Sequence, residues 1–235
     1  LGVYADRTRD VFDDPKVETI TSLVKRKLDL AVGIVTNTEI QDATPASMIA
    51  HTRRRAAYDE IVAQMFAAKP DVILGGGAAN FLPRTVDIGK RADEVDYIAK
   101  FKEAGYPYVK TAGELKAAAD KTDTTKLLGL FTPGNMDGVL DRKFLKGGGV
   151  KKYPEQPDLT EQVQAALDVL SRNDKGFMLL VESGMIDKYA HLLDMDRAVY
   201  DVIMLDNAVK LAKEWAAKRG EDTLILVVSD HSHPN

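Results

Sequence analysis

The chain has 235 residues, of which 45% are hydrophobic and 29% charged, with a net charge of −4 and no cysteine. These values are ordinary for a globular domain, and the length is sufficient to bury a full core. The absence of cysteine excludes a disulfide framework and a thiolate metal site. The acidic balance, with HTRRR at 51–55 as the only dense basic cluster, argues against nucleic acid as a partner. No apolar run approaches the ~18 residues of a membrane span, and none resembles a signal peptide.

Helical and strand-like patterns alternate along the chain. In chain order, we predict a helix over 17–28, a strand over 30–38, a long helix over 43–68, a strand over 71–77, a helix over 93–106, a strand and helix over 108–118, a strand over 126–132, a helix over 159–173, a strand over 177–181, a helix over 195–219 and a strand over 223–228. This order predicts a single α/β domain over 1–235, with a mostly parallel central sheet and helices on both faces.

Two irregular stretches interrupt this pattern. Residues 133–157 are rich in Gly and Pro, which predicts an excursion over the surface, and a position near an active site would suit it. The glycine triplet 75–77 ends a predicted strand. It either brings backbone close to a ligand or forms a plain strand-to-loop turn.

Polar residues that suit metal ions follow two of the predicted strands. Glu182, Asp187 and His191 come after 177–181, and Asp230 and His231 come after 223–228. Open α/β sheets place ligand sites at the carboxyl ends of such strands. Three of the chain's four histidines, the last in the DHSH motif of 230–233, lie in this part. The two clusters therefore predict a metal centre.

The spacing within each cluster bears on how it would bind metal. Asp187 and His191 are four residues apart, so a helical turn would place both on one face to share an ion. Asp230 and His231 are adjacent and need a loop that turns both inward. Zinc accepts Asp and His as ligands. Two such ions could bind the attacking and leaving oxygens of a displacement at phosphorus. Taken alone, an Asp after a strand is often a helix cap, and a lone His is usually not a ligand.

Long blocks of the chain also resemble the alkaline phosphatase family, in the family's order. They are VGIVTNTEIQDATPASMIAHTRRR (32–55), DVILGGG (71–77), LLGLFTPGNMDGVLDR (127–142), PDLTEQVQAALDVLSRNDKGFMLLVESGMIDKYAH (157–191) and TLILVVSDHSH (223–233). The resemblance implies hydrolysis of phosphomonoesters to inorganic phosphate through a phosphoserine intermediate. It also implies two zinc ions and one magnesium ion, with a zinc-activated water attacking in the second step.

The resemblance further implies roles for individual residues. Magnesium ligands would be Thr44 and Glu182. Zinc ligands would be Asp187 and His191 for one ion and Asp230 and His231 for the other. Arg55, on a helix, would hold the substrate phosphate, and Lys188 and Asp42 would support the ligands from the layer of residues behind them. Guanidinium can bind phosphate through two parallel hydrogen bonds. The Asp42 and Lys188 pair resembles the bacterial type, in which Lys188 would reach phosphate through water and Asp42 would order the magnesium shell. Asp42 could equally be a plain N-cap.

Departures from the family limit these expectations. The family's nucleophilic Ser and a metal-bridging Asp lie upstream of the block that resembles 1–10, and a further zinc-ligand His lies beyond Asn235. We assign no nucleophile in this chain, because Ser183 and Ser232 do not match that position and no G-x-S-x-G elbow exists. We therefore expect a fragment that is inactive alone and binds zinc weakly. The family implies a periplasmic or secreted homodimer.

Two alternatives stay open at this point. The chain could belong to another branch of the metal-dependent phosphatase, sulfatase and mutase group, although a sulfatase would need a Cys or Ser in a modification motif that is absent. It could also be a non-catalytic domain that keeps the phosphatase scaffold to bind a partner.

Overall fold

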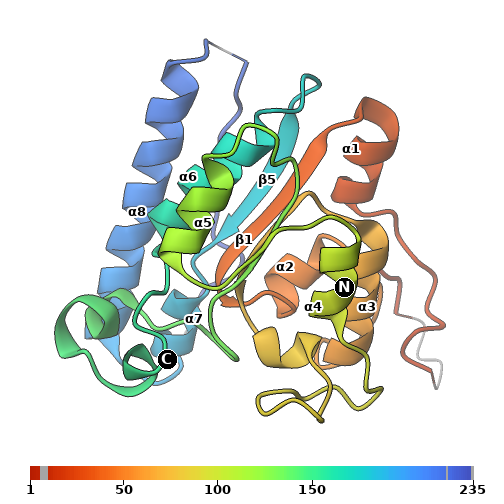
Figure 1. Ribbon diagram of the computed structural model, residues 1–235, viewed down its shortest axis with the longest axis horizontal. Coiled ribbons are helices and arrows are strands. Elements are labelled where there is room, and N and C mark those ends of the chain that lie inside the picture. Colours follow the sequence, from red (N-terminus) through yellow and green to blue (C-terminus); the bar gives the residue numbers. More distant parts are fainter. Residues whose placement is uncertain (6–9, 221, 234–235) are drawn as a thin grey trace.

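A five-stranded parallel sheet forms the centre of the computed structural model, which describes residues 1–5, 10–220 and 222–233 (Figure 1). The strands are β1 (Ala31–Glu39), β2 (Val72–Gly76), β3 (Tyr108–Val109), β4 (Leu127–Leu130) and β5 (Phe177–Glu182). Their order across the sheet is β3-β4-β2-β1-β5, and every neighbouring pair is parallel. The predicted α/β fold is confirmed.

Helices cover both faces of the sheet. One face carries α5 (Ala112–Ala119), α6 (Leu159–Leu170) and α8 (Met195–Ala217), and the other carries α1 (Ile20–Leu28), α2 (Ala43–Ser47), α3 (Tyr58–Ala68) and α4 (Tyr97–Glu103). In β1, Val35 packs into the first layer and Ile34 into the second, and both are fully buried. Strands buried on both faces read as continuous apolar runs, which is why the sequence revealed them.

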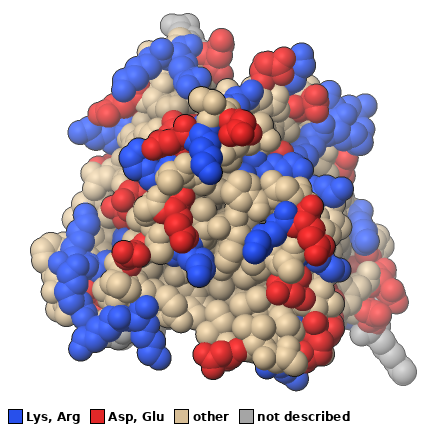
Figure 2. All heavy atoms as spheres, in the orientation of Figure 1, with Lys and Arg blue, Asp and Glu red and all other residues tan. Residues whose placement is uncertain are grey.

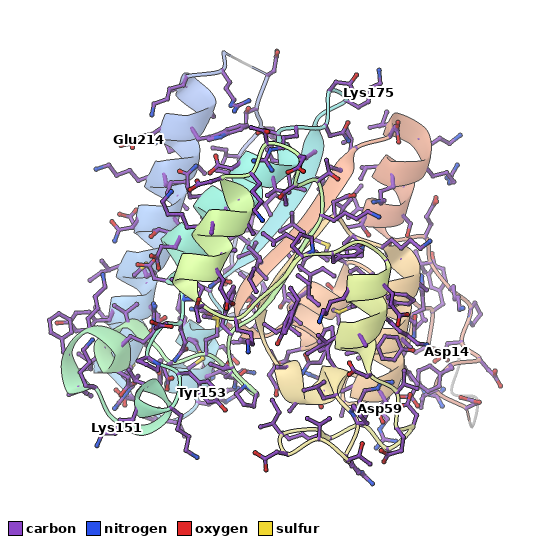
Figure 3. All side chains as sticks on the ribbon, in the orientation of Figure 1. Asp14, Asp59, Lys151, Tyr153, Lys175 and Glu214 are labelled. Atoms are coloured by element: carbon purple, nitrogen blue, oxygen red, sulfur yellow. The ribbon has the colours of Figure 1, made fainter. Side chains whose placement is uncertain are left out.

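The carboxyl ends of β1 and β5 meet at one end of the molecule. There β5 leads into the short helix α7 (Met185–Ala190), and β1 leads into α2. The 133–157 segment, with the short helical turns η2 (Asp141–Leu145) and η3 (Gly148–Lys151), lies at this same end. Figure 3 shows Lys151 and Tyr153 there, whereas Lys175, just before β5, lies at the opposite end.

The single helix predicted over 43–68 is wrong. The chain forms α2 and α3, separated by an irregular stretch from Met48 to Ala57. In that stretch the backbone N–H of Thr52 donates to the Leu1 carbonyl, and the N–H of Arg53 donates to the Val11 carbonyl. These long-range partners replace the i→i−4 bonds of a helix. Arg55 consequently lies in a loop instead of on a helix.

The strand predicted over 223–228 is also absent among the described residues. This stretch pairs with no strand, and Leu224, Leu226 and Val228 are each more than 70% exposed. The sheet ends at β5, an edge strand whose six residues are all only partly buried. An apolar run needs cover on both faces and a hydrogen-bonded neighbour to become a buried parallel strand, and this one has neither.

The glycine triplet brings two backbone segments together. A Cβ on Gly76 would overlap the carbonyl oxygen of Gly134, and Gly77 has a φ of +91°. The N–H of Gly77 donates to Gly134 O at 2.8 Å. Within the described residues the triplet therefore serves the close packing of the 132–134 loop.

Candidate metal and phosphate site

Helix α7 carries the first predicted ligand pair. Asp187 lies in its first turn and His191 is its C-cap residue, so the two side chains share one face. The Nε2 atoms of His191, His233 and His231 lie 3.4, 3.7 and 3.8 Å from Asp187 Oδ1. This oxygen is buried and accepts no hydrogen bond from the described residues. A buried carboxylate oxygen without a donor, facing imidazole nitrogens, is the arrangement that a cation would complete.

The residues present fit zinc. Ligand atoms of Asp187, His191 and His233 lie within 4.8 Å of one another, and the two histidine rings meet edge to face, with centroids 4.3 Å apart. Structural and catalytic zinc sites use this set of nitrogen and oxygen donors. Sequence reasoning did not assign His233. In an extended chain, residues two apart share a side, so the spacing of His231 and His233 was the available signal.

Asp230 does not join this group. Its carboxylate is 60% exposed and lies 3.3 Å from His231 Nε2. The carbonyl oxygen of Ser232 and then the Asp230 charge raise the pKa of His231. Among the described residues no third ligand group joins Asp230 and His231, and the second zinc site stays a prediction.

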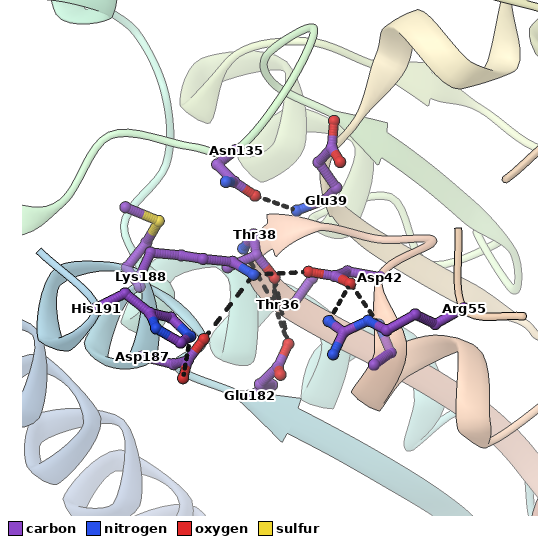
Figure 4. Close-up of polar contacts among 12 residues, drawn as sticks. Thr36, Thr38, Glu39, Asp42, Arg55, Asn135, Glu182, Asp187, Lys188 and His191 are labelled. Carbon is purple, nitrogen blue, oxygen red and sulfur yellow. Dashed lines mark hydrogen bonds and ion pairs between the residues drawn. The ribbon is translucent and has the colours of Figure 1, made fainter. Parts of the chain in front are cut away.

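Two cations converge on Asp42 (Figure 4). Arg55 donates to Oδ1 at 2.7 Å and Lys188 donates to Oδ2 at 2.8 Å. Burial alone would raise the pKa of this carboxyl, but the hydrogen bonds from Lys188 and Arg55 outweigh it, so the pKa is lowered. Asp42 also caps α2 by accepting from Ala43 N. Both of its predicted roles are compatible with this geometry.

Lys188 connects this pair to the histidine cluster. Its Nζ lies 4.0 Å from Asp187 Oδ2, and Figure 4 shows it between Asp42 and Asp187. The Arg55 side chain is 62% exposed, so solvent reaches its guanidinium. The arrangement is a line of alternating charges, open to solvent at Arg55, that an anion could enter.

Glu182 sits at the end of β5 beneath two threonines of β1. Its Oε2 accepts from Thr36 Oγ1 at 2.6 Å and from Thr38 Oγ1 at 3.3 Å. Thr44 lies in α2, and no hydrogen bond joins it to Glu182 in the described part of the chain. The assignment of these two residues to magnesium therefore stays a prediction.

A profile of the alkaline phosphatase family matches residues 1–235. The chain belongs to the alkaline phosphatase family. Its relatives include the alkaline phosphatase of Escherichia coli K12, 33% identical over 87% of this chain and 49% of that protein. The tissue-nonspecific isozyme of Gallus gallus is 35% identical over 99% of this chain and 49% of its own length. The family resemblance of the sequence is confirmed.

Solved alkaline phosphatases share the fold. The Thermus thermophilus structure superposes with a TM-score of 0.76 at 33% identity, over 88% of this chain and 40% of that one. A variant of TAB5 alkaline phosphatase, whose structure carries bound magnesium, gives 0.72 at 22% identity. The chain spans about half the length of the curated relatives it matches.

Two further properties concern the charge on the surface and the apolar length of the helices. Figure 2 shows acidic and basic side chains interspersed over the visible face. None of the helices in the described ranges is long and apolar enough to cross a membrane.

Proposed function

We propose that this chain supplies the phosphate-binding residues and part of the metal ligands of a metal-dependent phosphomonoester hydrolase. The observation that carries the proposal is the continuous line from Arg55 through Asp42, Lys188 and Asp187 to the histidines, at the carboxyl ends of β1 and β5. Membership of the alkaline phosphatase family supports the reaction class.

The proposed metal complement is two zinc ions and one magnesium ion, of which this chain provides incomplete ligand sets. Asp187 and His191 would hold one zinc ion, with His233 beside them, and Asp230 and His231 would hold the second. Glu182 and Thr44 would hold magnesium, an ion that one solved relative carries. Bound zinc would supply a Lewis acid for phosphoryl oxygens and for water.

The chain's own residues would bind and orient the phosphoryl group. Arg55 presents a planar guanidinium for paired hydrogen bonds, and Lys188 adds a second positive charge. Asp42 holds both cations in place and releases them to the incoming anion. These groups offset negative charge that builds on the phosphoryl oxygens during transfer.

The proposed reaction passes through a phosphoserine. Since we assign no nucleophile in this chain, we expect it to be inactive alone. By family, the natural setting would be a periplasmic or secreted homodimer, with phosphomonoesters as substrates and inorganic phosphate as product.

Calorimetric zinc titration of this chain tests the proposal. We expect saturable binding that Asp187→Ala abolishes and that Asp206→Ala, an exposed change on α8, leaves intact. Zinc binding that survives Asp187→Ala would contradict the metal assignment. In parallel, turnover of p-nitrophenyl phosphate that disappears in Asp187→Ala would show that the chain is active alone, against our expectation.

A further inference from the structure

Helix α7, which bears Asp187 and His191, lacks a capping side chain of its own. Its N-cap residue is Gly184, with no side-chain hydrogen bond to the helix. The N–H of Met185, the first helical residue, donates instead to Asn37 Oδ1 of β1 at 3.0 Å. A residue of the sheet thus accepts the hydrogen bond that a Ser, Asp or Asn at the N-cap position usually accepts.

Asn37 is in turn oriented by a buried carboxylate. Its Nδ2 donates to Asp201 Oδ1 of α8 at 3.1 Å, while Asp201 Oδ2 accepts from the N–H of Val139 at 3.2 Å. Asp201 is 1% exposed and Asn37 is 7% exposed, so water cannot readily replace these bonds. A carboxylate only accepts, so the nitrogen of the Asn37 amide must face Asp201 and its oxygen must face α7.

The position of Asn37 in β1 links this anchor to the site. Thr36 and Thr38 on either side of it bond to Glu182, on the opposite face of the strand. The backbone carbonyl of Asn37 also accepts from Met136 N, which brings the 136–139 loop to the same point. One short stretch of β1 therefore fixes Glu182 on one side and α7 on the other.

We propose that Asn37 and Asp201 are positioning residues for the metal-ligand helix, with Asn37 capping α7 from the sheet and Asp201 fixing the direction of its amide. Through α7 they set where Asp187, Lys188 and His191 stand relative to Asp42. The consequence for zinc rests on the proposed function, whereas the anchoring of α7 does not.

A reciprocal exchange of the two side chains tests this inference. Asn37→Asp alone places two carboxylates against each other. Asp201→Asn alone places an amide N–H₂ group against another donor, either the backbone N–H of Val139 or the side-chain N–H₂ of Asn37. The double variant restores a donor opposite an acceptor at each of these bonds. Asp206→Asn, exposed on the same helix, is the matched control.

Two readouts separate anchoring from metal binding. Amide hydrogen exchange at Met185 should accelerate about tenfold or more in each single variant and return to the wild-type rate in the double variant. The zinc dissociation constant should rise about tenfold in each single variant, in the range usual for lost outer-shell partners, and recover in the double variant. Urea unfolding of every variant shows whether an effect is merely global.

Each outcome decides the matter. Single variants with lower overall stability but unchanged Met185 exchange would overturn the positioning role, as would a double variant that fails to recover or to fold. If the single variants do not fold, a folded double variant with wild-type Met185 exchange supports the role. Absence of zinc binding in the wild-type chain would defeat the proposed metal centre, and Met185 exchange would still decide whether α7 is anchored.

Discussion

Asp42 is the residue on which the two cations of the site depend. Its carboxylate binds Arg55 through one oxygen and Lys188 through the other, and thereby competes with any anion for both. Asp42→Asn removes this charge while keeping a side chain that can cap α2. We expect the variant to bind inorganic phosphate about tenfold more tightly, or about 1.4 kcal/mol.

Calorimetric phosphate titration checks this expectation. Glu60→Gln, an exposed carboxylate-to-amide change on α3, should leave the dissociation constant unchanged. Equal or weaker phosphate binding in Asp42→Asn would mean that Asp42 organises the two cations more than it blocks them.

Asp201 gives the fold a pH dependence. Burial raises its pKa from 3.8 to about 6, although the hydrogen bond from Val139 lowers it. The folded state thus holds the proton more tightly than the unfolded state. The resulting stability is fully present below about pH 4 and is lost as pH rises through about 6, by about 3 kcal/mol for a shift of roughly two units.

Urea unfolding from pH 4 to pH 7 measures this loss. The free energy of unfolding of the wild type, relative to Asp201→Asn, should fall across that range and level off above it. A constant difference between the two proteins would show that Asp201 does not titrate there.

At the scale of elements, the sequence predicted those helices and strands whose formation depends on their own local pattern of residues. The strands β1, β2, β4 and β5 and the helices α6 and α8 were found because their apolar periodicity reflects their own burial. The break between α2 and α3 could not be found in this way. No Gly or Pro marks it, and its cause is backbone pairing with Leu1 and Val11, some 40 to 50 residues away.

The candidate site divides along the same line. Asp187 and His191 were predictable because they occupy one helical face next to a strand end. His233 approaches Asp187, and Arg55 and Lys188 converge on Asp42. These contacts depend on how loop segments fold back onto the sheet end, which the local sequence pattern does not encode. The capping of α7 by Asn37 of β1 could not be predicted either, since an Asn inside an apolar strand carries no pattern that points to a distant helix.

At the scale of the whole molecule, the described structure leaves apolar surface without cover. The run 223–228 is unpaired and mostly exposed, β5 is an edge strand, and α8 exposes Val199, Val202 and Ile203, each about half accessible. Exposed apolar strands and unpaired sheet edges favour pairing between chains. We therefore expect this chain to self-associate through the 223–228 segment.

Two lysines in that segment should suppress the association. In sedimentation velocity, Leu226→Lys with Val228→Lys should weaken self-association about tenfold or more, since charged side chains oppose edge pairing. Asp222→Lys adds the same two units of charge nearby without removing apolar surface, so it separates net charge from loss of the apolar face. If Asp222→Lys dissociates the chain equally well, general repulsion accounts for the effect. A wild-type chain that stays monomeric at every concentration would mean that the exposed run does not mediate contact between copies.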